Sequence, residues 1–162
     1  MPSSKSLTYP TPGPKAIALL KRFEGLRLET YRDAAGKRTI GYGHVILPTD
    51  HNQDWMTIAQ ADALLLQDLA KTASSVARLV HVQVSQSQMD ALCCFAFNIG
   101  VNAFARSTLL RKLNDGHLEQ AADEFSRWNK VTHSKTGTKV VLAGLTNRRL
   151  AERTLFISCD EE

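Results

Sequence analysis

The stretch RFEGLRLETYRDAAGKRTIGYGH, residues 22–44, joins the end of a helix to a tight hairpin. Gly25 is a typical residue to stop a helix, so Glu24 is expected at the helix end. The runs LETYRD and KRTIGYGH are rich in Tyr, Thr and Ile and are connected by a turn-like AAG, which predicts two antiparallel strands. Asp33 then lies near the turn and Thr39 on the return strand. Three polar side chains are therefore expected in one region.

Upstream of this stretch, the sequence predicts a leader and a first helix. Residues 1–14 are rich in Ser, Thr, Pro and Gly, so we expect a flexible leader and exclude it from the core. Pro14 itself suits a first helical position. Apolar residues then recur at helical spacing up to Phe23, which predicts a short helix that ends at Glu24.

Downstream of the hairpin, the hydrophobic pattern becomes helical. A capping box that begins at Thr57 precedes an apolar stripe through Leu79, which predicts one long helix. A second capping box begins at Ser85 and opens a very apolar segment over residues 89–97. Because this segment has no polar face, we expect it to be the buried central helix of a lobe.

The rest of the chain predicts more helices, and the hairpin is the only convincing sheet. Helices are expected at Ser107–Asn114, Leu118–Lys130 and Thr146–Ile157, the last with apolar Leu150, Leu155 and Phe156, and residues 131–144 are expected to form a loop or ribbon. No repeat with a period of 20 to 50 residues is present, which excludes a solenoid. The predicted fold class is α+β, mostly helical, with a small β-hairpin lobe, a long connecting helix and a helical C-terminal lobe.

Length and composition limit the class of protein. At 162 residues with 43% hydrophobic residues, the chain suits one domain with a sizeable core. Its net charge of +4 favours anionic partners, but no polybasic block indicates a nucleic-acid arm. No segment approaches the roughly 18 apolar residues of a membrane span, and the N-terminus lacks a signal-peptide pattern. We expect a soluble protein made in the cytosol.

Cysteine and histidine patterns argue against a metal site. The five histidines have no ligand spacing, and the adjacent Cys93 and Cys94 do not form a C-x-x-C motif, so we predict no metal. The three cysteines in total also argue against a disulfide framework. Cys93 lies in a run too apolar to stabilise a thiolate, which favours a buried structural thiol over a nucleophile.

The helix end and the hairpin suit one type of chemistry. Such an arrangement can place the carboxyl groups of Glu24 and Asp33 across a cleft. One carboxyl group would protonate a leaving oxygen while the other assists attack at carbon, which is the geometry of a glycosidase.

The spacing E-x8-D-x5-T, within the EGLR and TIGYGH context, resembles the catalytic signature of the phage-type lysozymes, glycoside hydrolase family 24. The segments QMDALCCFAFNIGVNAFARSTLLRKLN (residues 88–114) and GLTNRRLAERTLF (residues 144–156) are also similar to segments of that family. Residues 1–14 and 131–143 have no counterpart. The resemblance implies that residues 15–162 are a single lysozyme-like catalytic domain.

The family's catalytic roles can be transferred residue by residue. They imply that Glu24 is the general acid, while Asp33 and Thr39 hold the attacking water on the opposite face of the sugar. This arrangement implies inversion at the anomeric carbon and a separation of roughly 6.5–9.5 Å between the two carboxyl groups. The implied activity is that of an endolysin that hydrolyses the β-1,4 bond between N-acetylmuramic acid and N-acetylglucosamine in peptidoglycan, for host cell lysis.

The resemblance also implies supporting residues. Arg148 matches the arginine that contacts the catalytic acid, although the adjacent Arg149 leaves the register open by one residue. His44 and Asp68 match a pair that would fix the hairpin lobe onto the long helix and make stability depend on pH. Asn98 falls where the family has a polar amide that could bond an N-acetyl group.

Two alternatives and the biological setting remain at this stage. A lytic transglycosylase would use one acid and no water, and a noncatalytic basic module would bind wall glycan or nucleic acid without cleaving it. Nucleic acid is disfavoured because aromatic residues make up only 7% of the chain. The resemblance implies a monomer that needs no cofactor, has no stable membrane insertion, and reaches the cell wall in the periplasm after the membrane is permeabilised.

Overall fold

The hairpin predicted after Glu24 forms the small lobe of the molecule. The computed structural model describes residues 7–50 and 54–160, and here β1 (Arg27–Arg32), β2 (Arg38–Gly41) and the short β3 (His44–Val45) form an antiparallel sheet in the order β1-β2-β3. In β2, Thr39 and Ile40 are buried while Arg38 is exposed. The strand β3 extends the predicted hairpin to three strands.

Helix α1 (Pro14–Glu24) leads into this sheet. It begins with proline in its first turn, and its buried face carries Ala16 and Leu20. It ends at Gly25, whose φ of 69° lies in the left-handed region that favours glycine. The chain can therefore turn at once into β1, with Glu24 as the last helical residue.

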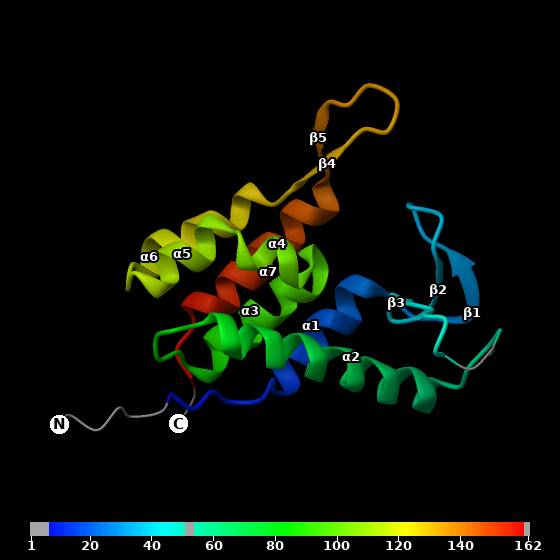
Figure 1. The fold of residues 1–162 in the computed structure, drawn as a ribbon, viewed down its shortest axis with the longest axis horizontal. Helices are drawn as coiled ribbons and strands as arrows, with labels where there is room; N and C mark the ends of the chain where they lie inside the picture. Colours follow the sequence, from blue (N-terminus) through cyan, green and yellow to red (C-terminus); the bar gives the residue numbers. More distant parts are fainter. Residues whose placement is uncertain (1–6, 51–53, 161–162) are drawn as a thin grey trace.

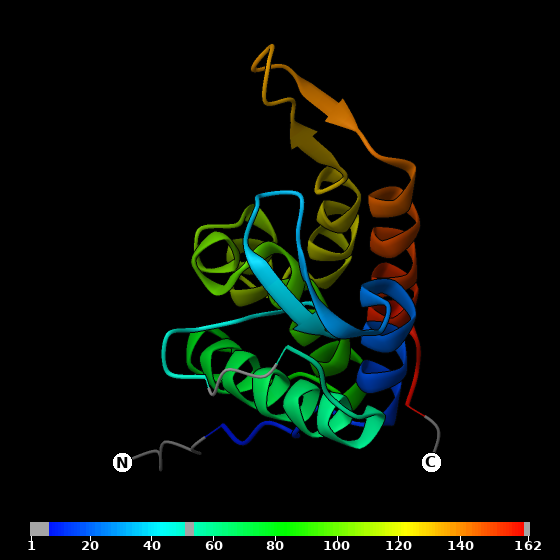
Figure 2. The same cartoon turned by 90° about the vertical axis from the view of Figure 1, so that its right-hand side faces the viewer.

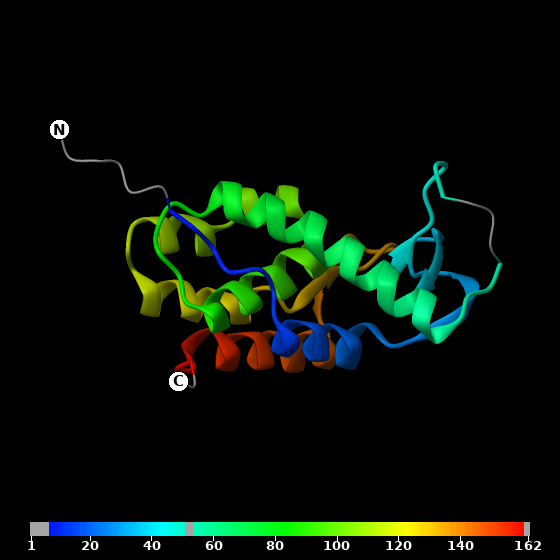
Figure 3. The same cartoon turned by 90° about the horizontal axis from the view of Figure 1, so that it is seen from below.

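Helix α2 (Ile58–Leu79) connects the small lobe to the helical lobe, and Figure 3 shows it running between them. The predicted capping box is present, because the Thr57 side chain accepts from the backbone of Gln60 and the Gln60 side chain accepts from the backbone of Thr57. The buried stripe of the helix consists of Ala61, Leu65, Leu69 and Val76. No helix in the described part of the chain is both long and apolar enough to cross a membrane.

Helix α3 (Gln86–Ile99) is the centre of the helical lobe (Figure 1). Nine of its residues are buried, all of them between Ser87 and Ala96, and they include both Cys93 and Cys94. Such burial is expected for a helix without a polar face. The ring of Phe95 makes edge contacts with the rings of Phe104, Phe125 and Trp128. This aromatic cluster fixes the surrounding helices on α3.

The remaining elements surround α3 and differ in places from the prediction. In chain order they are α4 (Val101–Ala105), α5 (Thr108–Asn114), α6 (Leu118–Glu124), the 3-10 turn η1 (Phe125–Arg127), β4 (Lys130–Thr132), β5 (Lys139–Val141) and α7 (Ala143–Ile157). The fold class α+β with a small β lobe, a long helix and a helical lobe is confirmed.

Two local predictions were wrong, those for the ends of the last two helices, and a third was less specific than the structure. The helix expected over 118–130 ends at Glu124, because η1 turns the chain so that the ring of Phe125 packs against those of Phe95 and Phe156. The segment 131–144, expected to be a loop or ribbon, contains a two-stranded ribbon in which β4 and β5 pair, and it stands out from the helical lobe in Figure 2. Helix α7 begins three residues before Thr146, and Leu150 of its predicted apolar stripe is 61% exposed.

Part of the predicted leader contacts the helical lobe. Residues 1–6 lie outside the described residues, and residues 7–13 contain no helix or strand. Tyr9 is nevertheless half-buried against the core, and its hydroxyl donates to the backbone oxygen of Val80. The backbone N–H of Gly13 donates to Asp90 of α3 over 2.9 Å. The exclusion of this segment from the core therefore does not hold for Tyr9.

Candidate active site

Glu24 lies where the end of α1 meets α7. Its Oε1 atom accepts a hydrogen bond from Nη1 of Arg148 over 2.7 Å, and the Glu24 side chain is 18% exposed. Arg148 is itself buried, and its guanidinium lies 5.8 Å from the centre of the Phe23 ring. The carboxyl group therefore has one oxygen fixed by a buried cation and keeps access to solvent.

Gly43 brings the hairpin into contact with this carboxyl group. A Cβ atom added at Gly43 would lie 2.6 Å from Oε2 of Glu24, and the φ of Gly43 is +71°. Both observations require glycine, one for the close approach and one for the backbone conformation. The GYG motif thus allows the backbone between β2 and β3 to pass directly beside Glu24.

Asp33 and Thr39 converge on the backbone of Lys37 at the tip of the hairpin. Oδ1 of Asp33 accepts from the N–H groups of Ala35 and Lys37 over 2.9 and 2.8 Å, which closes the turn. The hydroxyl of Thr39 donates to the backbone oxygen of Lys37 over 3.0 Å, and Thr39 is buried. Within the described residues, the second carboxylate oxygen of Asp33 makes no hydrogen bond, so it is available for a water molecule.

The structure resolves the register between the two arginines. Arg148 contacts Glu24, as predicted, whereas Nη2 of Arg149 donates to Oδ1 of Asn98 over 2.6 Å. Asn98 is exposed near the end of α3, so Arg149 connects the interior of the lobe to a surface amide. Outside α7, Arg148 therefore bonds to Glu24 on α1 and to the backbone oxygen of Cys94 on α3, whereas Arg149 bonds to Asn98 on α3.

Glu152 was not singled out by the sequence, although it completes this cluster. It follows Arg149 by three residues and Arg148 by four, so all three side chains lie on one face of α7. Glu152 is fully buried, with Oε1 at 2.8 Å from Nε of Arg149 and Oε2 at 3.4 Å from Nε of Arg148. The signal in the sequence is the R-R-x-x-E spacing, which a surface helix could equally use.

Burial and charge have opposite effects on these groups. Burial raises the pKa of Glu152 to about 7, although the charges of Arg149 and Arg148 lower it. Burial also lowers the pKa of Arg149. Nε of Arg149 and Oε1 of Glu152 are close enough for an ion pair but are not aligned for a hydrogen bond. The two side chains are therefore held by this ion pair together with one long hydrogen bond, which Nη2 of Arg149 donates to Oε2 of Glu152 over 3.5 Å.

His44 forms the predicted bond with Asp68 and a second one that was not predicted. Its Nδ1 lies 2.7 Å from Oδ2 of Asp68 on α2, and its Nε2 lies 2.9 Å from Oδ2 of Asp50. The hydrogen bond to Asp68 raises the pKa of His44, Asp50 adds to this effect, and burial opposes it. The hydrogen bond with His44 in turn lowers the pKa of Asp50. One histidine thus ties β3 to α2 and to the following loop.

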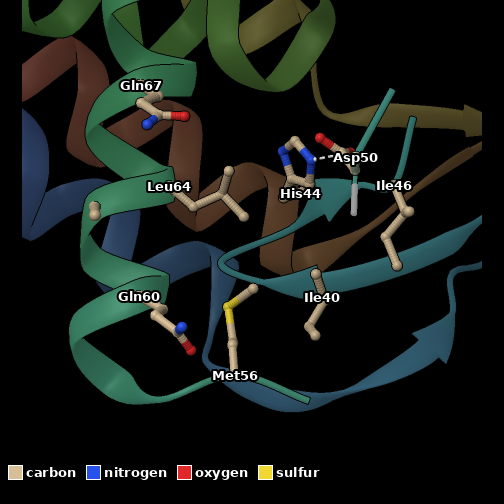
Figure 4. Close-up of a pocket in the computed structure, with 9 residues that line it drawn as sticks. Ile40, His44, Ile46, Asp50, Met56, Gln60, Leu64 and Gln67 are labelled. Carbon is tan, nitrogen blue, oxygen red and sulfur yellow. Dashed lines mark hydrogen bonds and ion pairs between the residues drawn. The ribbon is translucent and has the colours of Figure 1, made fainter. Parts of the chain in front are cut away.

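A pocket of about 370 Å³ lies behind this histidine, between the sheet and α2 (Figure 4). Its walls are largely apolar, with Ile40 and Ile46 from the β lobe facing Leu64 of α2, and His44 at one side. None of Glu24, Asp33 and Thr39 lines it. The pocket therefore lies between the β lobe and α2 and is separate from the carboxyl groups of Glu24 and Asp33.

The two adjacent cysteines are buried thiols, as predicted. Both are free, and burial raises the pKa of Cys93 to about 12 and that of Cys94 well above its ordinary value. A thiol that stays protonated is a poor nucleophile. Neither cysteine is a candidate for catalysis.

A helix-end glutamate bonded to a buried arginine lies next to a hairpin that carries Asp33 and Thr39, an arrangement that suits a glycoside hydrolase of the lysozyme type. The model of the Phage lysozyme family matches residues 21–152. The chain belongs to the phage lysozyme family, and it is a glycoside hydrolase.

Individual relatives agree with this assignment. An endolysin of Acyrthosiphon pisum secondary endosymbiont phage 1 is 43% identical over 147 residues, which cover 89% of this chain and 96% of that protein. An endolysin of Bacillus phage B103 is 42% identical over 144 residues, covering 88% of this chain, but the match spans only 52% of that longer protein. The solved muramidase domain of SpmX from Asticaccaulis excentricus is 36% identical, with a TM-score of 0.85 and coverage of 94% of this chain and 100% of that chain.

Proposed function

We propose that this lysozyme is an endolysin that cleaves the β-1,4 bond between N-acetylmuramic acid and N-acetylglucosamine of peptidoglycan, with Glu24 as general acid. The observation that carries the proposal is the position of Glu24, held by Arg148 and touching Gly43 of the hairpin. The hairpin also carries Asp33 and Thr39. Acid and water-binding groups are thus supplied by two adjacent parts of the chain.

The reaction follows from these roles. Glu24 donates its proton to the glycosidic oxygen as the bond to the anomeric carbon breaks. A water molecule held by the free oxygen of Asp33 and by Thr39 attacks that carbon from the opposite face, and Asp33 accepts the proton that the water loses. The sugar product is inverted, and a carboxyl separation of roughly 6.5–9.5 Å between Glu24 and Asp33 would leave room for the water.

The supporting residues have assigned roles in this proposal. Arg148 orients the acid, and Asn98 presents its amide N–H to an N-acetyl group of the substrate. The His44–Asp68 pair fixes the hairpin lobe on α2 and has a structural role. No metal or other cofactor takes part in the proposed steps.

The proposed setting is the bacterial cell wall. The protein would be made in the host cytoplasm and would reach peptidoglycan in the periplasm as a monomer, once the membrane is permeabilised. The net charge of +4 suits attraction to an anionic wall polymer, and a nucleic-acid target is not proposed. Lysis from within, which requires a separate membrane lesion, and a molecular mass of one chain in solution would support this setting.

Digestion of purified peptidoglycan tests the activity and the acid together. Wild type should release muropeptides with reducing ends, and Glu24→Gln should release none, as seen by chromatography and mass spectrometry. Glu119→Gln, which changes an exposed glutamate on α6, serves as the control and should behave like wild type. Products with anhydro ends would indicate a transglycosylase, and binding without cleavage by wild type would indicate a wall-binding module.

A further inference from the structure

A single buried carboxylate, that of Glu152, connects Glu24 to Asn98 through two arginines. Glu152 lies between the guanidinium groups of Arg148 and Arg149, and all three side chains are at least 95% buried. Arg148 continues to the carboxyl group of Glu24, and Arg149 continues to the amide of Asn98. The cluster therefore branches from one interior group to two groups that face solvent.

The charges make Glu152 necessary for this arrangement. If Glu24 is neutral when it acts as an acid, Glu152 is the only carboxylate in contact with the two arginines within the described residues. Buried cations without a counter-charge are strongly unfavourable. The guanidinium of Arg149 also lies 5.1 Å from the centre of the Phe95 ring, which restricts its position further.

The contact between Arg149 and Asn98 selects one orientation of the amide. Because an arginine only donates hydrogen bonds, the atom that accepts from it must be Oδ1 of Asn98. The Nδ2 group is then directed away from Arg149, and it has no partner among the described residues. The exposed amide is thus fixed as a hydrogen-bond donor and would select an acceptor such as a carbonyl oxygen.

We propose that Glu152 is a positioning residue that acts on the reaction through both arginines, setting the charge beside Glu24 through Arg148 and the orientation of the Asn98 amide through Arg149. The proposal rests on the proposed function, in which Glu24 is the acid and Asn98 contacts the sugar. Glu152 and the two arginines are not assigned contact with substrate.

The titration of Glu152 gives the proposal a measurable consequence. The groups that face it are Arg148 and Arg149 on α7, Glu24 from α1 and Cys94 from α3. Because burial raises the pKa of Glu152 to about 7, Glu152 loses its charge as the pH falls through neutrality. The ion pairs of Glu152 with Arg148 and Arg149 should weaken in the same pH range.

Nuclear magnetic resonance of the wild-type protein tests the link to Asn98 without a substrate. The side-chain amide signals of Asn98 should titrate with the same midpoint as the carboxyl carbon of Glu152. Arg149→Met should abolish this titration, and Arg153→Met, which alters an exposed ion pair with Asp123 on the same helix, should retain it. If the amide signals of Asn98 do not change over the pH range in which Glu152 titrates, the proposal is overturned.

Kinetics of peptidoglycan cleavage test both branches. Glu152→Gln should lower kcat/KM by about tenfold or more, the effect of weakening one hydrogen bond to a charged group. It should also move the alkaline limb of the pH profile to lower pH, because loss of the buried carboxylate leaves the charge of Arg148 beside the acid less compensated. A lower melting temperature with an unmoved pH profile would show a purely structural role and would overturn the proposal.

A double-mutant cycle isolates the branch through Arg149. Arg149→Met and Asn98→Ala should each raise KM more than they lower kcat, and Asn98→Ala should add little in the Arg149→Met background. Additive effects would contradict action through Asn98. An inactive wild type, or an active Glu24→Gln variant, would instead refute the proposed function, while the substrate-free titration would still decide the link from Glu152 to Asn98.

Discussion

At the scale of single residues, the site depends on close contacts that leave no room for substitution. Gly43 lies against the carboxyl group of Glu24, and Arg148 fixes the other oxygen of that group. A proton donor works only when its position relative to the reacting bond is maintained, and small displacements reduce the rate strongly. Residues beside Glu24 can therefore control activity without taking part in the chemistry.

Gly43→Ala should reduce activity on peptidoglycan by about 100-fold, since its new methyl group would displace the Glu24 carboxyl group. Gly36→Ala is the matched control, because Gly36 also has a positive φ, of +79°, but has open space around its Cβ position. Both variants should lose about 1–2 kcal/mol of stability from backbone strain. Equal activity of the two variants would show that the contact with Glu24 is unimportant.

His44 should make stability depend on pH in a defined direction. Its folded-state pKa is raised above the ordinary value of 6.5, so its contribution to stability is fully present below pH 6.5 and is lost as the pH rises through the folded-state pKa. His44→Gln should cost about 1.5–3 kcal/mol at acidic pH. The cost should be smaller in alkaline solution, and urea unfolding across this range measures it. A pH-independent cost would mean that His44 is not charged in the folded protein.

At the scale of elements, sequence reasoning succeeded where local signals and packing agree. The capping boxes at Thr57 and Ser85 defined the starts of α2 and α3, and the glycine after Glu24 defined the end of α1. It failed where contacts between distant segments decide the structure. The helix after Leu118 stops because Phe125 turns into the aromatic cluster, and nothing in the local sequence indicates that turn.

The same distinction applies to the candidate site. The spacing of Glu24, Asp33 and Thr39 and its family resemblance singled out these residues as catalytic candidates, and their roles remain predictions. Asp50 and Glu152 were missed, since each becomes important only through contacts made by folding. A lone aspartate in a loop or a glutamate on a helix is too common in sequences to be singled out. The two partners of the adjacent arginines likewise required the structure.

The cap of α3 provides a test at this scale. Ser85→Ala removes the hydroxyl that accepts from the backbone of Gln88, and it should lower the free energy of unfolding by about 1 kcal/mol. Ser74→Ala, at an exposed position within α2, should be neutral or slightly stabilising because alanine favours helix. Thermal and urea unfolding of both variants give the comparison. Equal stability of the two variants would rule out a significant role for the cap.

At the scale of the whole molecule, charge should matter for the approach to the substrate. The net charge of +4 attracts an anionic polymer, and dissolved salt screens this attraction and shortens its range. Raising the ionic strength should therefore increase KM for whole peptidoglycan and leave kcat nearly unchanged. Peptidoglycan whose carboxyl groups have been amidated serves as the control substrate and should show a much weaker dependence. A salt effect confined to kcat would contradict diffuse attraction as the cause.

Both ends of the described chain are fastened at the start of α3. The side chain of Gln86 donates to the backbone oxygen of Thr11, and the carboxylate of Asp160 accepts from the backbone N–H groups of Gln86 and Ser87. Glu24 lies at the far end of the 11-residue helix α1, roughly 15 Å from its first residue. A binding module fused at either end would therefore emerge from the same side of the enzyme, and the two fusion orders should be interchangeable without obstructing the acid.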